Sequence, residues 1–439
     1  MTQNPHTVAV IGAGPVGLAA AAHLVERGIE PVVFEAGDAV GASIREWGHV
    51  RVFSPWELNI DPAAGRLLDD AGWNAPDLDA YPTGAEIVAR YLEPLASLPA
   101  IAPALHLGAR VSAVTRHGID KLKDDGRDDA PYELVVEEGG EERRYLASAV
   151  IDASGTWTRP NPLGAGGLPA QGERAAAGRI AYGIPDVLGA DRARYAGRRV
   201  LVVGSGHSAF NAILDLVALR DSEPATEVVW AIRGAAPGRR YGGGGDDQLP
   251  ARGALGATVR GLVDDGSVEL AGGFQVRRVS LEAGRVSVTS GATTIVADEI
   301  IAATGFRPDL SLLSELRLDF DDRVEAARAL APLIDPNVHS CGSVPPHGVD
   351  ELGHPDDGVF MVGMKSYGRA PTFLLRTGYE QVRSVVAALA GDWESARRVE
   401  LVLPETGVCN RSAAPAATGA AQSACCGSGS PHAGATTVA

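Results

Sequence analysis

The chain has no long hydrophobic run and no basic segment ahead of its first apolar stretch. A helix needs about 18 or more consecutive apolar residues to cross a bilayer, and no stretch approaches that length. The first apolar stretch is short and ends in glycine, which is not the pattern of a secretory signal peptide. We therefore expect a cytoplasmic protein rather than a secreted or membrane-spanning one.

Cysteine and positive charge are also scarce. The four cysteines are too few and too clustered for a disulfide framework, and they are Cys341, Cys409, Cys425 and Cys426. The formal net charge is −16 at pH 7, so the phosphates of nucleic acids and of anionic membranes are repelled. The composition therefore argues against nucleic acid and membrane as partners, and we expect no resident metal site.

Glycine is abundant by contrast, and it forms two fingerprints of one kind. The first reads Gly12-Ala-Gly14-Pro15-Val-Gly17, and the second reads Gly204-Ser-Gly206-His207-Ser208-Ala209. Each follows an apolar run of strand length and precedes a helix of small residues. Two such motifs in one chain predict that two dinucleotides bind and that electrons pass between them.

The first motif has the features of an FAD site. Gly12 permits a tight turn, Gly14 lets the backbone approach a pyrophosphate, and Gly17 lets helix and strand pack closely. The helix N-terminus supplies amides and a partial positive charge. Glu35 ends the second strand, where a carboxylate accepts hydrogen bonds from a ribose diol.

The second motif differs at the strand end that follows it. Aligning Val-Val-Phe-Glu35 with Val-Val-Trp-Ala231 puts alanine where the acid stood, and Arg233 follows two residues later. A carboxylate there would repel a ribose 2′-phosphate, whereas an arginine would bind it. The second nucleotide is therefore predicted to be NADPH, with His207 contacting phosphate at the helix start.

The order of elements predicts an α/β fold with two Rossmann-like dinucleotide-binding domains, the second inserted into the first. A β-meander is expected between the two, and a disordered, cysteine-containing tail after them. The expected boundaries are 1–158 and 298–403 for the FAD-binding domain, 159–297 for the NADPH-binding domain and 404–439 for the tail.

Two further segments complete a family pattern. Together with the glycine motifs, Asp152-Ala153-Ser154-Gly155 and Ala303-Thr304-Gly305-Phe-Arg-Pro resemble the two-dinucleotide flavoproteins over about residues 7–395. The spacing is most similar to class B flavin monooxygenases, and the wider pattern resembles flavin monooxygenase-like proteins of bacterial arsenic-resistance operons. The resemblance implies FAD, NADPH, dioxygen, a 4a-hydroperoxyflavin and a small-molecule substrate. It also implies cofactor contacts at Pro15, Ala36, Arg45, Trp47, Val111, Ala153, Ser154, Gly155, Ser208, Ala209, Thr304, Gly305, Gly363 and Lys365.

Three residues are candidates for the oxygen chemistry. Trp56 would wall a dry pocket or serve as a packing anchor, and Asn59 resembles the asparagine that positions oxygen in flavin-containing monooxygenases, or caps a turn. Lys365, one of three lysines, would stabilise negative charge near the flavin or flank a helix.

Arg45 is a candidate for a different role: it would touch the FAD pyrophosphate or be a surface charge.

The sequence also departs from the monooxygenase pattern. Residues 178–186 lack the expected Phe-x-Gly-x-x-x-His signature, and Val362-Gly363-Met364-Lys365 stands where a Gly-Asp pair is usual. A reductase or oxidase that passes electrons to a small oxidant or to thiols is therefore an alternative. A metalloid-binding redox sensor is another, since Cys409, Cys425 and Cys426 would offer soft thiolates. A homodimer is compatible with all three.

Overall fold

The computed structural model describes residues 7–401, apart from 243, 245–246, 248, 339–343 and 371–372. All of the described residues lie within one compact unit. The four cysteines, the expected tail and the side chains of Arg239 and Arg240 lie outside the described residues.

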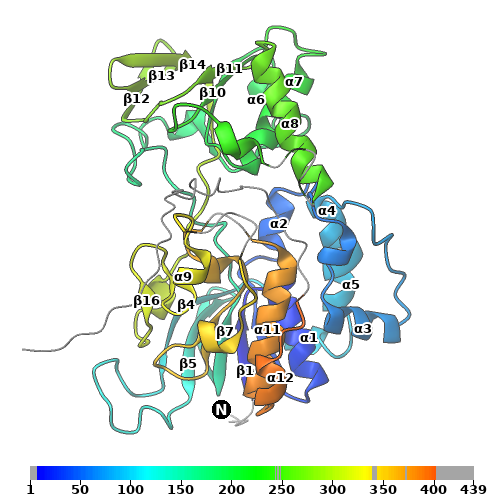
Figure 1. The fold of residues 1–439 in the computed structure, drawn as a ribbon. Coiled ribbons are helices and arrows are strands. Elements are labelled where there is room, and N and C mark those ends of the chain that lie inside the picture. The colour runs from blue at the N-terminus through cyan, green and yellow to red at the C-terminus, as the bar shows by residue number, and fades with distance from the viewer. Residues whose placement is uncertain are drawn as a thin grey trace, which may run out of the picture. The chain divides into compact units, whose positions relative to one another are not determined.

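The first sheet has five parallel strands, in the order β18-β7-β1-β2-β3. Its strands are β1 (Thr7–Ile11), β2 (Glu30–Phe34), β3 (Leu105–His106), β7 (Ala149–Asp152) and β18 (Val359–Met361). Helix α1 (Pro15–Glu26) lies beside α11 (Leu375–Leu389), although the two are far apart in the chain (Figure 1). Because α1 is alanine-rich and buried on most of its surface, both sheet and helix can pack closely against it.

Short helices and an antiparallel meander complete this part of the molecule. The segment after β2, expected to be loops and short helices, contains α2 (Ala42–Glu46), η1 (Trp56–Leu58), α3 (Pro62–Asp70), α4 (Gly84–Ile87), η2 (Val88–Leu92), α5 (Glu93–Ala96) and η3 (Ala102–Ala104). The meander consists of β4 (Ala109–Arg116), β5 (Tyr132–Glu138) and β6 (Glu141–Ala147).

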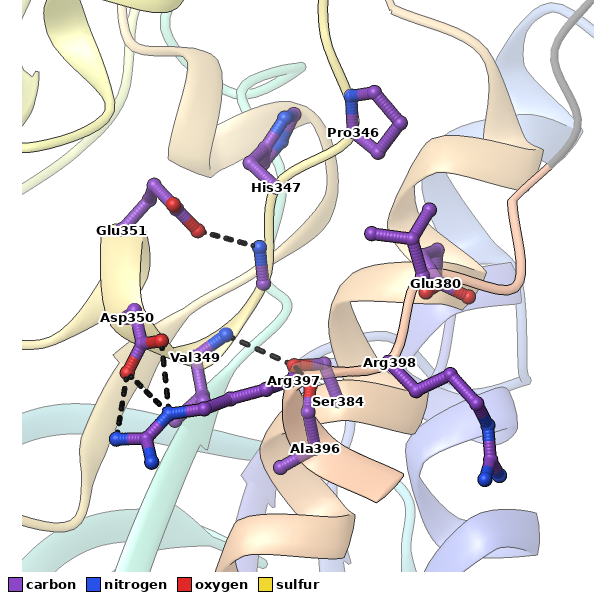
Figure 2. Close-up of a pocket in the computed structure, with 12 residues that line it drawn as sticks. Pro346, His347, Val349, Asp350, Glu351, Glu380, Ser384, Ala396, Arg397 and Arg398 are labelled. Atoms are coloured by element: carbon purple, nitrogen blue, oxygen red, sulfur yellow. Dashed lines mark hydrogen bonds and ion pairs between the residues drawn. The ribbon is translucent and has the colours of Figure 1, made fainter. Parts of the chain in front are cut away.

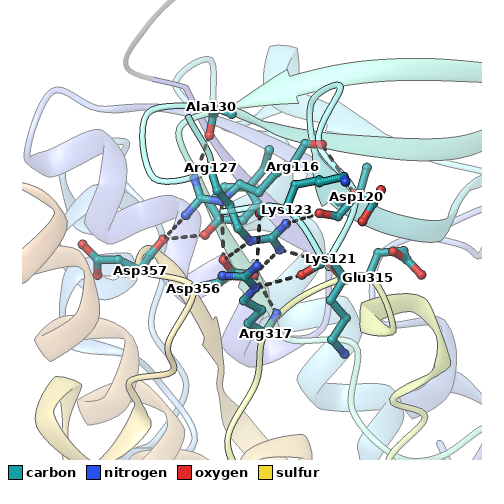
Figure 3. A network of polar contacts seen from close by, with 12 residues as sticks. Arg116, Asp120, Lys121, Lys123, Arg127, Ala130, Glu315, Arg317, Asp356 and Asp357 are labelled. Atoms are coloured by element: carbon teal, nitrogen blue, oxygen red, sulfur yellow. Dashed lines mark hydrogen bonds and ion pairs between the residues drawn. The ribbon is translucent and has the colours of Figure 1, made fainter. Parts of the chain in front are cut away.

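The loop between β4 and β5 is anchored by a buried ion pair. Arg127, 1% exposed, donates from Nε and Nη2 to the two carboxylate oxygens of Asp356, at 2.9 and 2.7 Å (Figure 3). The same guanidinium donates to the backbone carbonyls of Asp120 and Glu315. The loop between β4 and β5, which appears in the sequence as a polar interruption, is therefore bound to the segment that immediately precedes β18.

The second sheet is also parallel, in the order β11-β10-β9-β15-β8. Its strands are β8 (Ile180–Tyr182), β9 (Arg199–Val203), β10 (Glu227–Ala231), β11 (Glu269–Ala271) and β15 (Glu299–Ala302). Helices α6 (Arg192–Tyr195), α7 (His207–Leu219) and α8 (Pro250–Asp264) belong to this part, as does the antiparallel sheet of β12 (Arg278–Glu282), β13 (Arg285–Ser290) and β14 (Thr293–Ala297). The predicted fold class is confirmed, because this segment lies in the chain between strands of the first sheet.

The boundary expected at residue 298 is wrong. β15 pairs with β9 and β8, so residues 299–302 complete the second sheet rather than begin the return to the first. The strand is apolar and ends in a glycine turn, which is why it looked like a copy of β7. β8 was missed altogether, because it has three residues within a Gly- and Pro-rich segment.

The remaining elements are short. They are η4 (Ala177–Arg179), η5 (Gly238–Tyr241), η7 (Ser311–Leu313), β16 (Phe320–Asp321), β17 (Ala326–Ala327), α9 (Ala331–Ile334), α10 (Val349–Leu352), η8 (Gly363–Tyr367) and α12 (Trp393–Arg397). Among the helices within the described ranges, none is both long and apolar enough to span a lipid bilayer.

Candidate dinucleotide-binding sites

Each glycine motif lies where the strand order of its sheet reverses. In the first sheet β2 lies on one side of β1 and β7 on the other, and in the second sheet β10 and β15 flank β9 in the same way. The loops that leave the carboxyl ends of these strands diverge, and ligands of open α/β sheets bind in the crevice between them. We call the ligand position that this rule predicts between the loops after β1 and β7 the first crevice, and the one that it predicts between the loops after β9 and β15 the second crevice.

The first glycine loop is shaped for close packing on one side and for open space on the other. Gly12 has a φ of +100°, and a Cβ there would lie 2.8 Å from the carbonyl oxygen of Ala153. A Cβ on Gly17 would lie 1.9 Å from the carbonyl oxygen of Gly12. A Cβ on Gly14 would have no atom within 4 Å. The space that a side chain would fill at Gly14 is therefore free in front of α1.

The start of α1 suits an anion. Gly14 is the N-cap and offers no side-chain cap, Pro15 opens the helix, and the first turn has no acidic residue. The unpaired amides and the helix dipole are then available to a phosphate. The residues present therefore fit the pyrophosphate of a dinucleotide.

Glu35 lies at the end of β2 with its carboxylate held in place. Its two oxygens accept hydrogen bonds from the backbone N–H of Ala13, at 2.8 Å, and of Gly37, at 2.9 Å. Ala36, the next residue, is exposed. Each carboxylate oxygen keeps an acceptor lone pair, so this arrangement fits a ribose diol at the same end of the crevice.

Other residues expected around the first crevice are already engaged within the protein. Arg45 donates to the carbonyl of Val40 and pairs with Glu93 at 2.8 Å, as a surface charge would. Trp47 is half-buried, as is Val111 at a bulge in β4. The structure does not give these residues the fixed, ligand-facing geometry that it gives Glu35.

Trp56 and Asn59, the two candidates in the segment after α2, are both buried and packed within the protein. Trp56 is 2% exposed and belongs to the main core. Asn59 is 1% exposed, and its amide nitrogen donates to the carbonyls of Ser54 and Pro55 at 2.8 and 2.7 Å. Its side-chain oxygen accepts from the Ser54 hydroxyl at 3.0 Å. Both N–H donors of Asn59 therefore hold its own turn, as the turn interpretation expects.

Lys365 occupies a place that neither expectation described. A lysine facing the flavin or flanking a helix would keep its ammonium accessible, whereas this side chain is fully enclosed. Its Nζ lies 2.5 Å from Oδ2 of Asp152 and 2.9 Å from Oγ of Ser154. The adjacent Gly363 has a φ of +69° and packs against Val16 of α1. Lys365 therefore belongs to a buried ion pair, which corrects both expectations.

The second crevice repeats the first in detail. Gly204 has a φ of +136°, and a Cβ there would lie 2.1 Å from the carbonyl oxygen of Ala303. Gly206, the N-cap of α7, has nothing within 4 Å of a Cβ position. Ala209 is fully buried, and it holds the position in the second motif that Gly17 holds in the first. The first turn of α7, including Ser208, again lacks an acidic residue and a side-chain cap.

The strand register corrects the alignment of the two motifs by one residue. Ile11 pairs with Phe34 and Val203 pairs with Ala231, so the residue equivalent to Glu35 is Ile232, not Ala231. Ile232 is 1% exposed. Arg233 is then equivalent to the exposed Ala36 and is itself exposed, with one long contact of 3.5 Å to the carbonyl of Ala165. After this correction, the segment that follows β10 still lacks an acid and still carries an arginine.

His207, at the start of α7, is uncharged at neutral pH. Burial, together with the positive charge of Arg252, lowers the pKa of its imidazole to about 4. The ring lies 4.9 Å from that of Phe53. Arg252 in turn forms a buried two-pronged pair with Asp247. Phe53 thus lies beside the start of α7, and the charge of Arg252 acts on His207 at the same place. No spacing in the sequence indicated a role for Phe53 or Arg252 there.

A separate small hollow lies among α10, α11 and α12 (Figure 2). None of the residues expected to bind a cofactor lines it. Its polar groups satisfy one another, since Arg397 pairs with Asp350 at 3.1 Å and Ser384 accepts from the Val349 N–H. We therefore assign the nucleotide sites to the glycine crevices. The described ranges hold no group of three or more His, Cys, Asp and Glu side chains that would ligate a metal.

The chain is similar to several known proteins in sequence or in fold. Residues 7–74 match a family model described as FAD dependent oxidoreductase. The chain is 30% identical to indole-3-pyruvate monooxygenase YUCCA6 of Arabidopsis thaliana over 213 residues, which is 47% of this chain and 44% of that enzyme. It is 27% identical to a ferredoxin–NADP reductase of Salinispora tropica over 77% of this chain and 85% of that protein. The fold resembles bacillithiol disulfide reductase Bdr of Bacillus cereus, with a TM-score of 0.65, 21% identity, and coverage of 88% and 99%. The match of residues 7–74 supports the FAD-type first site.

Proposed function

We propose that this chain is an FAD-dependent oxidoreductase that draws its electrons from NADPH. The observation that carries the proposal is a pair of crevices with the same architecture and different strand ends. Glu35 follows strand β2 at the first crevice, and Ile232 and Arg233 follow strand β10 at the second crevice. Because the architecture is shared, the difference is a difference of ligand rather than of fold.

In the first crevice, the backbone before α1 binds the FAD pyrophosphate. Gly14 leaves the room for it, and Glu35 accepts hydrogen bonds from the ribose hydroxyls. A 2′-phosphate is disfavoured at this position, because it would face the Glu35 carboxylate.

In the second crevice, the exposed guanidinium of Arg233 pairs with the 2′-phosphate of NADPH. Ile232 offers neither a charge nor an acceptor, so the ribose of NADH gains no carboxylate partner. His207 is neutral, and it donates a single N–H without adding charge at the helix start.

Bound FAD, held by the backbone before α1 and by Glu35, would supply the chemistry that accepts a hydride from NADPH and transfers electrons to an acceptor. We propose that dioxygen is the acceptor and that a small molecule is oxygenated. The name of the plant relative, a monooxygenase, supports this. The cysteines of the chain include no Cys-x-x-Cys pair, which a dithiol route for the electrons would use.

A second candidate is an NADPH–flavin reductase or oxidase without oxygenation of a substrate. One observation favours it. Both amide donors of Asn59 are committed to Ser54 and Pro55, so this residue has none left to hold oxygen unless its turn rearranges. The name of the Salinispora relative, a reductase, agrees with this candidate.

Anaerobic flavin bleaching tests the use of NADPH. Purified protein should be yellow and should bleach far faster with NADPH than with NADH. Arg233→Ala should lower kcat/KM for NADPH by about 10- to 150-fold, the equivalent of one charge-assisted hydrogen bond of about 1.5–3 kcal/mol, and should leave NADH unchanged. Arg174→Ala, at another exposed arginine in the same inserted segment, is the matched control. A wild type that prefers NADH, or an Arg233 variant that keeps its preference, contradicts the assignment.

Reoxidation separates the two candidates. Reduced protein mixed with oxygen should pass through a transient absorbance that belongs to neither oxidised nor reduced flavin if it is a monooxygenase. Immediate, stoichiometric hydrogen peroxide without that transient indicates the reductase or oxidase.

The tail supplies one further proposal, which concerns residues outside those described. We propose that thiols at Cys409, Cys425 and Cys426 bind a metalloid such as arsenite and take no part in turnover. Truncation after Pro404 should then leave flavin reduction intact and abolish arsenite binding. Loss of flavin reduction contradicts the passive role.

A further inference from the structure

The Lys365–Asp152 ion pair is enclosed within the protein. Neither side chain has any exposed surface, and 2.5 Å separates Nζ from Oδ2. An enclosed ammonium and carboxylate lose their hydration, and geometry of this quality is needed to offset that loss. Such a pair in this position requires an explanation.

The pair converges on Ser154. The Ser154 hydroxyl donates to Oδ1 of Asp152 at 2.6 Å, the Ser154 backbone N–H donates to the same oxygen at 3.1 Å, and Nζ of Lys365 donates to the hydroxyl oxygen at 2.9 Å. Ser154 itself is exposed. Its proton is thus directed toward Asp152 and one of its lone pairs toward Lys365, which leaves one acceptor lone pair.

The pair joins two of the loops that leave the carboxyl ends of the strands in the first sheet. Asp152 ends β7 and Lys365 lies in η8, just after β18, and these two strands are neighbours. On the other side of β7, the loop rests against the glycine motif, because the carbonyl of Ala153 lies over Gly12. Lys365 therefore fixes the loop that forms one wall of the first crevice.

The second half of the molecule shows that the turn does not need these charges. By strand register Ala302 is equivalent to Asp152, and Thr304 is then equivalent to Ser154. There the loop is held by neutral contacts, since the Thr304 hydroxyl donates to the carbonyl of Asn161 and the Asn161 amide donates to that of Thr304. The same backbone turn thus forms with alanine in place of the buried acid.

We propose that Asp152 and Lys365 are positioning residues that orient Ser154 toward the cofactor of the first crevice. The remaining lone pair of Ser154 accepts a hydrogen bond from a hydroxyl or imide N–H of bound FAD. This inference rests on the proposed function, because it takes the ligand of the crevice to be FAD. It concerns how the site is held, which the glycine motif alone does not specify.

The test uses a neutral replacement copied from the second crevice. Lys365→Met combined with Asp152→Ala removes both charges, and replacing a buried pair by apolar side chains is often neutral for stability. Ser154→Ala removes only the hydroxyl, and Ser154→Thr restores a hydroxyl of the kind that Thr304 carries. Ser311→Ala is the matched control, because the Ser311 hydroxyl and backbone N–H donate to Oδ1 of Asp309, at 2.6 and 3.0 Å, just as those of Ser154 donate to Asp152. The readouts are the thermal midpoint of the apoprotein, the Kd for FAD and the visible spectrum of bound FAD.

The double variant should keep the thermal midpoint of the wild type, bind FAD about 2- to 10-fold more weakly, because the pair acts through the Ser154 hydroxyl, and show a shifted flavin spectrum. Ser154→Ala should weaken FAD binding by about 2- to 10-fold, the equivalent of one neutral hydrogen bond, and Ser154→Thr should restore it. Ser311→Ala should leave the Kd for FAD unchanged.

Three results overturn the inference. The first is a double variant whose Kd and flavin spectrum match the wild type, since the pair would then be purely structural. The second is Ser154→Ala with unchanged FAD binding, which is informative even if the double variant fails to fold. The third is a wild-type apoprotein that does not bind FAD, which removes the proposed function and this inference together.

Discussion

Gly14 and Gly17 belong to one motif but meet opposite surroundings, so the same substitution should have opposite effects at the two positions. A Cβ on Gly17 would lie 1.9 Å from the carbonyl oxygen of Gly12. A Cβ on Gly14 would meet nothing within 4 Å, and its φ of −81° and ψ of −173° are accessible to alanine. We predict that Gly17→Ala destabilises the fold and that Gly14→Ala blocks the ligand.

The magnitudes follow from this geometry. Relief of the Gly17 contact would require α1 to move from β1 by about 1 Å, and α1 is buried on most of its surface. Overpacking of this kind costs about 1–3 kcal/mol, and we expect about 3 kcal/mol here because α1 cannot yield. At about 2 °C per kcal/mol for a large chain, the thermal midpoint should fall by about 6 °C.

Gly14→Ala should change the free energy of unfolding by less than about 1 kcal/mol, since a poorer N-cap is offset by a less flexible unfolded chain. Its methyl group occupies the space of the pyrophosphate. Loss of two charge-assisted bonds from backbone N–H groups, at about 1.5–3 kcal/mol each, would raise the Kd for FAD by about 10²- to 10⁴-fold.

Two measurements on each apoprotein are sufficient. Thermal unfolding reports the packing effect, and fluorescence titration with FAD reports the Kd. If Gly14→Ala binds FAD as tightly as the wild type, the space in front of α1 is not the pyrophosphate site. If Gly14→Ala is as unstable as Gly17→Ala, the argument from free space is wrong.

Three further predictions follow from single contacts. Glu35→Gln should raise the Kd for FAD by about 10- to 100-fold, measured by the same titration, because a carboxamide has one acceptor oxygen instead of two. His207 has its pKa lowered to about 4 in the folded state, so the unfolded chain binds its proton first and stability falls as the pH drops from 6.5 toward 4, by up to about 1.4 kcal/mol per pH unit. Urea unfolding of His207→Gln should show a shallower loss over that window, and an unchanged slope would contradict the shifted pKa. Arg127→Met should lower the free energy of unfolding by about 1.5–3 kcal/mol, because it removes the two-pronged partner of Asp356 and leaves that carboxylate with the Arg317 N–H and the Arg116 guanidinium 3.8 Å away, and a loss below about 1 kcal/mol in urea unfolding would show that the pair is not needed.

Much of each glycine motif was predictable because it is local. A strand, a turn that requires a positive φ at glycine, and a helix lie within about twenty residues of one another, and their spacing carries the information. The same is true of Glu35, which ends the next strand along the chain. These features led to the two nucleotide sites and to the inserted fold.

The errors arose where pairing between distant segments decides the outcome. A one-residue difference in register moved the equivalent of Glu35 from Ala231 to Ile232. Two apolar strands that both run into glycine turns, β7 and β15, look alike in sequence and belong to different sheets. Burial of Asn59 in its own turn depends on hydrogen bonds that no spacing rule describes.

The sequence by itself predicted two dinucleotide crevices, with an acid beside one glycine motif and an arginine beside the other, because backbone conformation at glycine and charge at a strand end are local properties. Only the tertiary structure decided what holds those crevices in shape. Lys365 and Asp152 are 213 residues apart and meet because β18 and β7 are neighbours in the sheet. Strand order is set by the packing of the whole chain, and so the pairing of these two charges, and the orientation of Ser154 that follows from it, is a property of the fold.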